Sequence, residues 1–498
     1  MSRFENLPAE LYDEIFEHIF YSSWDHSAVT RRPSRDDLHP FDRAINIHRR
    51  PVERSIRWWP RPGDIQLRLV SHAFNRAMMR VYFKYVGAVF IPSEKNALEL
   101  FEEHVISQKR NVPWSIADAT AKFTIELCSP ENEDEAAIFH ESHKDMISWV
   151  KSGDRVPELD EGAERLKAAL ETGTLARAVQ NMPRLESLVI NLNQEWRDDE
   201  GDWDDSEDDE SIVSSGLQLR LELLQTVRES VAAIFTLYGV PNIKTGIRHL
   251  SLLTYLRLTL PCAYDFAQVA SSMPDTIALR LRHLYLEIVD GTGPGGDRSY
   301  THSWQGDGDP FDGDEGHRFS NLQRQYPNTA YMQDMCGLVN QCNNLESLGL
   351  VGTQCINLKG LHWQPANDAG LKSIYFSRVV ATEEQLLSLL TSGREDGACH
   401  TEAFDIEDVE LMDGTWKSVF SRLLTSSSLV FFQVYNLKYN TRGHSAHLAR
   451  YNHRPWENVS EIWSESRQDC KNLADLIRTV ERRGIKAVDR MKQYDKSN

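Results

Sequence analysis

Hydrophobic residues recur along the chain in short clusters with the spacing LxxLxL, in which leucine is sometimes replaced by another aliphatic or aromatic residue. The five well-matched copies are residues 185–190, 247–252, 281–286, 345–350 and 371–376. Weaker copies follow at residues 406–411 and 429–434. Because successive side chains of a strand point to opposite faces, each copy predicts a short strand with one buried face.

Helical patterns precede most of these predicted strands. Apolar residues three and four positions apart indicate one face of a helix. Such patterns lie at residues 164–180, 217–238, 331–341, 383–390 and 416–424. Nearer the start, residues 89–91 and 123–127 have the character of strands, and residues 96–107 that of a helix. The sequence therefore predicts a repeating unit of one helix and one strand.

This unit resembles the leucine-rich repeat, in which a strand and a helix bury their apolar faces only against neighbouring repeats. The resemblance implies an irregular α/β solenoid, with parallel strands on one face and helices on the other. The alternative is an ordinary α/β domain with helices on both faces of the sheet.

Uneven intervals between the copies predict inserted loops. Ten of the thirteen residues from 198 to 210 are acidic, so we expect a disordered, solvated insertion over residues 196–214. Residues 290–318 are rich in Gly and Asp and predict a long loop. Its acidic residues suit a solvated loop better than a cation site, because no glutamate closes a calcium-binding frame.

Two amphipathic segments near the start form a separate pattern. Residues 7–20 carry an apolar stripe at every fourth position, with Pro8 suited to the first turn of a helix. Residues 67–79 again place apolar residues on one helical face. The two segments, LPAELYDEIFEHI and LRLVSHAFNRAM, resemble the two halves of the F-box, with residues 21–63 inserted between them. This suggests an F-box protein, of a kind abundant in filamentous fungi.

The F-box resemblance implies the substrate-recognition subunit of a cullin-RING (SCF-type) ubiquitin ligase. Such a subunit binds a Skp-type adaptor, and through it the ligase, and holds an unidentified protein substrate on its repeats. No catalytic residue is then expected, because the ligase's other subunits supply the chemistry. The residues that the resemblance assigns to adaptor binding are Leu7, Pro8, Leu11, Ile15, Leu67, Val70 and Phe74. A repeat scaffold unconnected to ubiquitination is the alternative.

The expected organisation has three parts. Residues 1–86 form the F-box-like helical domain, residues 87–460 the solenoid, and residues 461–498 a C-terminal helical cap. At 498 residues the chain is long enough for several domains or a repeat array.

The composition of the chain limits the classes of partner and the cellular compartment that we expect. The formal net charge of −19 disfavours nucleic acid, whose phosphates require a basic surface. No apolar run is long enough to cross a membrane, and no signal peptide is evident. Seven cysteines without a CxxC pair favour reduced thiols. We therefore expect a cytoplasmic or nuclear protein that does not bind membranes.

Motifs for cofactors and metals are weak. Residues 291–296 match GxGxxG, but the following residues cannot open the helix that would hold a pyrophosphate. His140 and His143 are one residue too close for an HExxH zinc site. We expect no cofactor and no metal, and a hydrolase or metalloenzyme using the acidic loops is the least favoured hypothesis.

Overall fold

The computed structural model describes a part of the chain that includes most of the predicted repeats. The described residues are 11, 80, 83, 87–92, 96–106, 116–127, 161–171, 173–192, 210–236, 250–290, 322, 325–366, 370–391, 399–439, 447–454 and 457–497. Most of the predicted F-box-like segment and of the two predicted insertions lies outside them.

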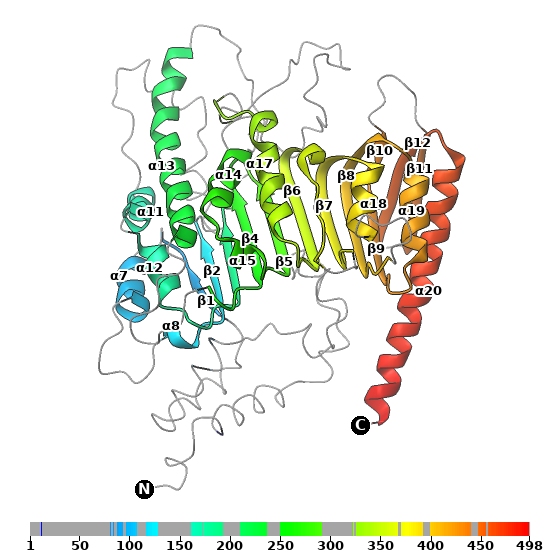
Figure 1. Ribbon diagram of the computed structural model, residues 1–498, viewed down its shortest axis with the longest axis horizontal. Helices are drawn as coiled ribbons and strands as arrows, with labels where there is room; N and C mark the ends of the chain where they lie inside the picture. The colour runs from blue at the N-terminus through cyan, green and yellow to red at the C-terminus, as the bar shows by residue number, and fades with distance from the viewer. Residues whose placement is uncertain are drawn as a thin grey trace.

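The described residues form an α/β structure around one parallel sheet of ten strands, in which consecutive strands of the chain are neighbours (Figure 1). β9 and β10 both pair with β8 and together form the last position. The strands are β1 (Ala88–Phe90), β2 (Lys122–Glu126), β3 (Ser187–Asn191), β4 (Tyr255–Leu260), β5 (His283–Ile288), β6 (Ser347–Asn357), β7 (Ser373–Thr382), β8 (Ala403–Asp413), β9 (Phe431–Tyr435) and β10 (Lys438–Tyr439).

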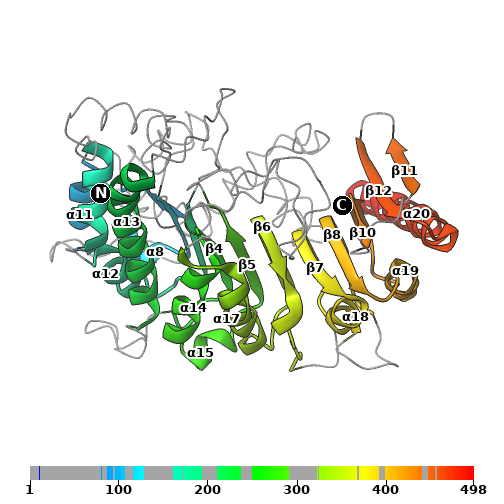
Figure 2. The ribbon, with the colours of Figure 1, turned by 90° about the horizontal axis from the view of Figure 1, so that it is seen from above.

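Helices connect successive strands. They are α7 (Ala97–Phe101), the π-helix η4 (Glu102–Ile106), α8 (Ile116–Ala119), α11 (Glu161–Glu171), α12 (Thr174–Gln180), α13 (Glu210–Thr236), α14 (Ala263–Ser272), α15 (Asp275–Ala278), α17 (Asn328–Gln341), the 3-10 helix η7 (Leu358–Gly360), α18 (Glu383–Thr391) and α19 (Trp416–Thr425). Figure 2 shows α12, α14, α15, α17, α18 and α19 on the same face of the sheet. These helices cover one face of the sheet, whereas the alternative domain would have helices on both faces.

Two rows of buried side chains run across the strands of the sheet. The strand register aligns the inward-facing residues of successive repeats, so that each packs against its equivalents in the neighbouring strands. The first row is Phe123, Leu188, Leu256, Leu284, Leu348, Ile374, Phe404 and Phe432. The second row is Ile125, Ile190, Leu258, Leu286, Leu350, Phe376, Ile406 and Val434. All belong to one hydrophobic core, as expected when each repeat is covered by its neighbours.

The helices complete this core, and α19 shows how their sequence determines them. Trp416, Phe420 and Leu423 recur three and four positions apart and are buried. The Thr415 hydroxyl caps the helix by accepting a hydrogen bond from the Ser418 backbone N–H at 3.3 Å. The capped, one-sided helix therefore begins at a defined residue and packs against the sheet.

The last strands of the sheet share an unusual backbone conformation at one level. Arg378, Asp408 and Asn436 occupy this level, and each adopts the left-handed conformation, with φ of 58°, 50° and 49°. The Asn436 amide donates to the Asp408 carboxylate, and the Arg378 guanidinium lies 3.9 Å from it. These contacts hold residues with unfavourable backbone conformations. Beyond this level β7 continues to Thr382 and β8 to Asp413, past the segment that LxxLxL predicts.

A different element covers the C-terminal end of the sheet. β11 (His447–Arg454) and β12 (Glu457–Ser464) form an antiparallel pair, and α20 (Arg467–Ser497) packs beside α19 (Figure 1). The buried Asp469 carboxylate of α20 accepts hydrogen bonds from the Lys417 backbone N–H (2.8 Å), the Tyr439 hydroxyl (2.6 Å) and the Ser464 hydroxyl (2.6 Å). Asp469 therefore connects this end element to the last repeats.

The structure corrects several sequence predictions. The copy at residues 247–252 is misplaced, because β4 begins at Tyr255 and its buried residues fit LxxLxL from Leu253. The copy at 406–411 lies in β8, but the register aligns Phe404 and Ile406 with the other repeats. The helix expected over 164–180 is two helices, separated at Gly173, whose φ is +65°.

Two predicted boundaries also differ. The last residues of the expected disordered insertion, 210–214, are the start of α13. The expected cap from residue 461 is not wholly helical, because β12 crosses that boundary. The helices α14 and α15 and the β11–β12 pair were not predicted.

Candidate protein-binding surfaces

The outward face of the sheet displays polar and aromatic side chains between the buried rows. At its centre, Arg257 of β4, Tyr285 of β5 and Tyr375 of β7 occupy the same level of neighbouring or nearby strands. The Arg257 guanidinium lies 5.3 Å from the centroid of the Tyr285 ring, and the Tyr285 and Tyr375 rings stack at 6.2 Å. We call these three residues the strand-face cluster. Its members come from strands of one hydrogen-bonded sheet, which sets the spacing between them.

Hydrogen bonds fix the buried member of the cluster. Tyr285 is only 1% exposed, and its hydroxyl donates to the Glu287 carboxylate at 3.0 Å. The Thr259 hydroxyl donates to the same oxygen at 3.3 Å. Burial, reinforced by the negative charge of Glu287, raises the pKa of Tyr285 well above its usual value. Tyr285 therefore remains a protonated hydrogen-bond donor, and the Arg257 guanidinium lies over its ring.

Arg257 is the member of the cluster with unused hydrogen-bonding capacity. Its buried Nε atom has no hydrogen-bond partner within the described residues. Glu126 of β2 lies close enough for Arg257 to affect its titration. Burial raises the pKa of Glu126, although the Asn191 amide, which donates at 2.7 Å, and the charge of Arg257 oppose this rise. The side chains of Arg257 and Tyr375 are partly exposed, and arginine and tyrosine are enriched at protein interfaces.

A second surface lies at the edge where the strands begin. One residue per repeat precedes each strand, and its carbonyl accepts two backbone N–H bonds from the next repeat, as at Arg282, which receives Glu346 (2.7 Å) and Ser347 (3.0 Å). The side chains of these edge residues form a row across the repeats. The row runs Glu186, Thr254, Arg282, Glu346, Lys372 and Glu402. From Arg282 onward its charges alternate in sign.

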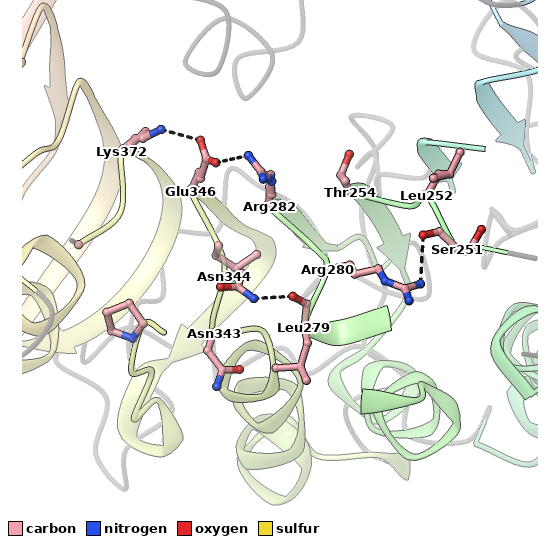
Figure 3. Close-up of a pocket in the computed structure, with 13 residues that line it drawn as sticks. Ser251, Leu252, Thr254, Leu279, Arg280, Arg282, Asn343, Asn344, Glu346 and Lys372 are labelled. Carbon is pink, nitrogen blue, oxygen red and sulfur yellow. Dashed lines mark hydrogen bonds and ion pairs between the residues drawn. The ribbon is translucent and has the colours of Figure 1, made fainter. Parts of the chain in front are cut away.

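A groove with a volume of about 560 Å³ lies along this row (Figure 3). The Glu346 carboxylate bridges two cations, accepting from the Arg282 guanidinium at 2.9 Å and the Lys372 ammonium at 2.8 Å. Partial burial acts to raise the pKa of Glu346, but the hydrogen bond from Lys372 and the charges of Lys372, Arg282 and His283 together lower it. Glu346 is therefore ionised at neutral pH.

The opposite wall of the groove is formed by the turns that precede β4, β5 and β6. The Asn344 amide donates to the Leu279 carbonyl at 2.6 Å, and the Arg280 guanidinium donates to the Ser251 carbonyl at 3.0 Å. Figure 3 shows both contacts below the row of Lys372, Glu346 and Arg282. The groove is thus built from several repeats and held by bonds between them.

The structure describes only one of the predicted adaptor-binding residues. Leu11 is helical and 42% exposed. The others lie outside the described residues: Leu7, Pro8, Ile15, Leu67, Val70 and Phe74. The interaction proposed for this segment therefore rests on the sequence.

Sequence reasoning did not identify the strand-face cluster or the groove. A usable signal was present, because Arg282, Glu346 and Lys372 occupy the same position of successive LxxLxL copies. Alternating charges at one repeat position indicate a cross-repeat row of ion pairs.

No protein-family model matches the sequence, and no curated protein is significantly similar to it. Within the described residues, no helix is both long and apolar enough to span a bilayer. The same residues contain no group of three His, Cys, Asp or Glu side chains placed to hold a metal ion.

Proposed function

We propose that this protein is the substrate-recognition subunit of an SCF-type ubiquitin ligase, built on an irregular leucine-rich-repeat-like solenoid. Its N-terminal F-box-like segment binds a Skp-type adaptor, and its strand face binds the protein to be ubiquitinated. The observation that carries this proposal is the aligned stack of LxxLxL strands, which buries one face and places the partly exposed Arg257 and Tyr375 on the other.

The strand face suits protein binding for physical reasons. A sheet assembled from successive repeats presents one extended surface on a rigid support. Arg257 and Tyr375 are only partly exposed, so a partner need order few flexible groups to engage them. The hydrogen bond between Tyr285 and Glu287 holds the cluster in position before a partner arrives.

The F-box-like segment supplies the connection to ubiquitination. Leu7 and Pro8 lie at the start of the first predicted helix, where the family's interface motif begins. In this arrangement the protein needs no catalytic residue of its own. It raises the effective concentration of its target near the conjugating enzyme, which other subunits of the ligase position.

Binding to a purified Skp-type adaptor tests the proposal. We expect the full-length protein to bind the adaptor and the Leu7→Ala, Pro8→Ala variant to bind at least about thirtyfold more weakly, as for loss of an apolar anchor. The matched control is Leu100→Ala, which truncates a leucine of α7 that is 54% exposed. Circular dichroism verifies that all three proteins are folded.

Two outcomes contradict the proposal. If the wild type does not bind the adaptor, the connection to the ligase is wrong, and a repeat scaffold independent of ubiquitination becomes the better explanation. If the folded double variant binds like the wild type, the assigned adaptor site is wrong.

A further inference from the structure

The groove at the start of the strands has an excess of positive charge in a strongly acidic protein. The described side chains that line it include the cations Arg280, Arg282 and Lys372 and one carboxylate, Glu346. Glu346 is shared between Arg282 and Lys372, and none of the described residues offers a carboxylate to Arg280. The groove therefore attracts negative charge, although the whole chain has a net charge of −19.

The cations are available to a ligand. The side chains of Arg282 and Lys372 are 62% and 46% exposed. Ion pairs between such exposed groups are weak, because water screens them and holding the side chains in place costs entropy. An incoming carboxylate can therefore bind either cation with little loss of the existing pairs. Arg280 lies farther along the groove and provides a second anchoring point.

The groove also carries apolar surface and amide groups. Leu252 and Leu279 both line it and are 48% and 44% exposed, so they offer apolar surface to a ligand. Asn343 and Asn344 lie on the Leu279 side of the groove, where the Asn344 amide already donates to the Leu279 carbonyl (Figure 3). Such amides can hydrogen-bond to the backbone of an extended peptide. Cationic, apolar and amide groups are thus placed within one groove.

We propose that this groove binds an acidic peptide segment of a partner protein, one that places a leucine or similar side chain between its carboxylates. The carboxylates pair with Arg280 and with Arg282 or Lys372, and the apolar side chain covers Leu252 and Leu279.

A peptide fits these features better than a nucleic acid does. Nucleic acids gain affinity by neutralising many phosphates, and this groove has only a small surplus of cations. The rest of the acidic protein repels a long polyanion. The exposed leucines have no role in binding phosphates but favour an apolar side chain.

The inference goes beyond the proposed function and is tested without the adaptor. The groove residues are distant in sequence from the F-box-like segment, so either proposal can fail while the other stands.

Fluorescence anisotropy with labelled synthetic peptides provides the test. The probe is a peptide of sequence GDELDDLEG, compared with its amide analogue GNQLNNLQG and its serine analogue GDESDDSEG. Full-length wild type is compared with Arg280→Glu, Arg282→Glu and with a control that reverses two exposed charges on α20, Lys471→Glu, Arg482→Glu. If circular dichroism shows that the groove variant is misfolded, Arg280→Gln, Arg282→Gln replaces it.

We expect the wild type to bind the acidic peptide about tenfold or more tightly than either analogue, and more weakly as salt is added. The groove variant should lose about tenfold or more in affinity, whereas the control should change less than about twofold. The inference is overturned if the wild type does not bind at about 1 mM, if the amide analogue binds equally, or if both variants lose the same affinity. Tighter binding of a labelled 12-nucleotide single strand at the groove would instead identify a polyanion site.

Discussion

A buried ion pair between α13 and α14 is the most informative place to perturb the helical layer. The Arg228 guanidinium pairs with the Asp265 carboxylate, and the two side chains are 9% and 1% exposed. Asp265 also accepts hydrogen bonds from the Cys262 backbone N–H at 3.0 Å and its thiol at 3.1 Å. The guanidinium lies 4.5 Å from the Tyr264 ring centroid and 5.2 Å from that of Tyr326. The pair thus joins two helices and the segment before α17.

The substitution Asp265→Asn removes the negative charge but keeps a side-chain oxygen that can cap α14. The asparagine side-chain oxygen can still accept from the Cys262 N–H, but Arg228 loses its counter-charge in a buried position. Leaving one buried charge unpaired typically costs about 3–5 kcal/mol of unfolding free energy. Arg228→Met leaves Asp265 unpaired and should cost a similar amount at neutral pH. The double variant removes both charges, so its cost should fall several kcal/mol short of the sum of the single costs.

The pH dependence of Arg228→Met provides a second check. Burial raises the pKa of Asp265 above its usual 3.8 even with Arg228 present. The folded state therefore binds the proton more strongly than the unfolded state, and lowering the pH through the folded-state pKa favours folding. The cost of Arg228→Met relative to wild type should fall as the pH decreases, because protonation removes the unpaired charge.

Urea unfolding of the four proteins, followed by circular dichroism, measures these free energies. The analysis requires similar denaturant slopes, which show that the extent of unfolding is unchanged. If the single costs add to within about 0.5 kcal/mol in the double variant, the two groups are not coupled and the proposed pair is wrong.

Three further predictions concern the sheet, the C-terminal end and the groove. Leu348→Ala should cost roughly 2–5 kcal/mol in urea unfolding because Leu348 is fully buried, whereas Leu252→Ala, at a residue 48% exposed, should cost about 0.5 kcal/mol or less. Asp469→Ala should destabilise the C-terminal end by roughly 3 kcal/mol or more and accelerate amide exchange throughout α20, because three donors lose a charged acceptor. Glu346→Gln should be destabilising at neutral pH, and the difference from wild type should disappear as the pH falls through the lowered pKa of Glu346, because protonation then removes the charge that Arg282 and Lys372 stabilise.

The LxxLxL spacing predicted much of the sheet because the buried rows determine both the spacing and the register. The copies at 185–190, 281–286, 345–350 and 371–376 have their leucine-equivalent positions buried. The copy before β4 was misplaced because Leu250 and Leu252 imitate the spacing. Only tertiary packing distinguishes the buried Leu250 and Leu253 from the exposed Leu252.

Other features depend on contacts between repeats, which the hydrophobic periodicity of the sequence does not predict. The bends at Arg378, Asp408 and Asn436 arise from contacts between adjacent strands. The strand-face cluster brings together Arg257, Tyr285 and Tyr375 from different repeats. The groove likewise requires the correct register, because the misplaced copy at 247–252 put Thr254 outside the predicted strand unit. The charged members of the row are visible at one position of the LxxLxL copies, whereas the opposite wall of the groove depends on how the turns before β4, β5 and β6 pack.

The most direct test of substrate recognition compares two variants, each expected to lose a different set of partners, in cells treated with a proteasome inhibitor. Tagged wild type, the Leu7→Ala, Pro8→Ala variant and Arg257→Ala are purified, and their associated proteins are measured by quantitative mass spectrometry. We predict that wild type recovers the adaptor, the cullin and a set of ubiquitinated proteins. The F-box variant should lose the adaptor and the ubiquitination while retaining the same proteins, and Arg257→Ala should retain the adaptor but lose those proteins. Recovery of the same proteins, equally ubiquitinated, by all three would contradict the account.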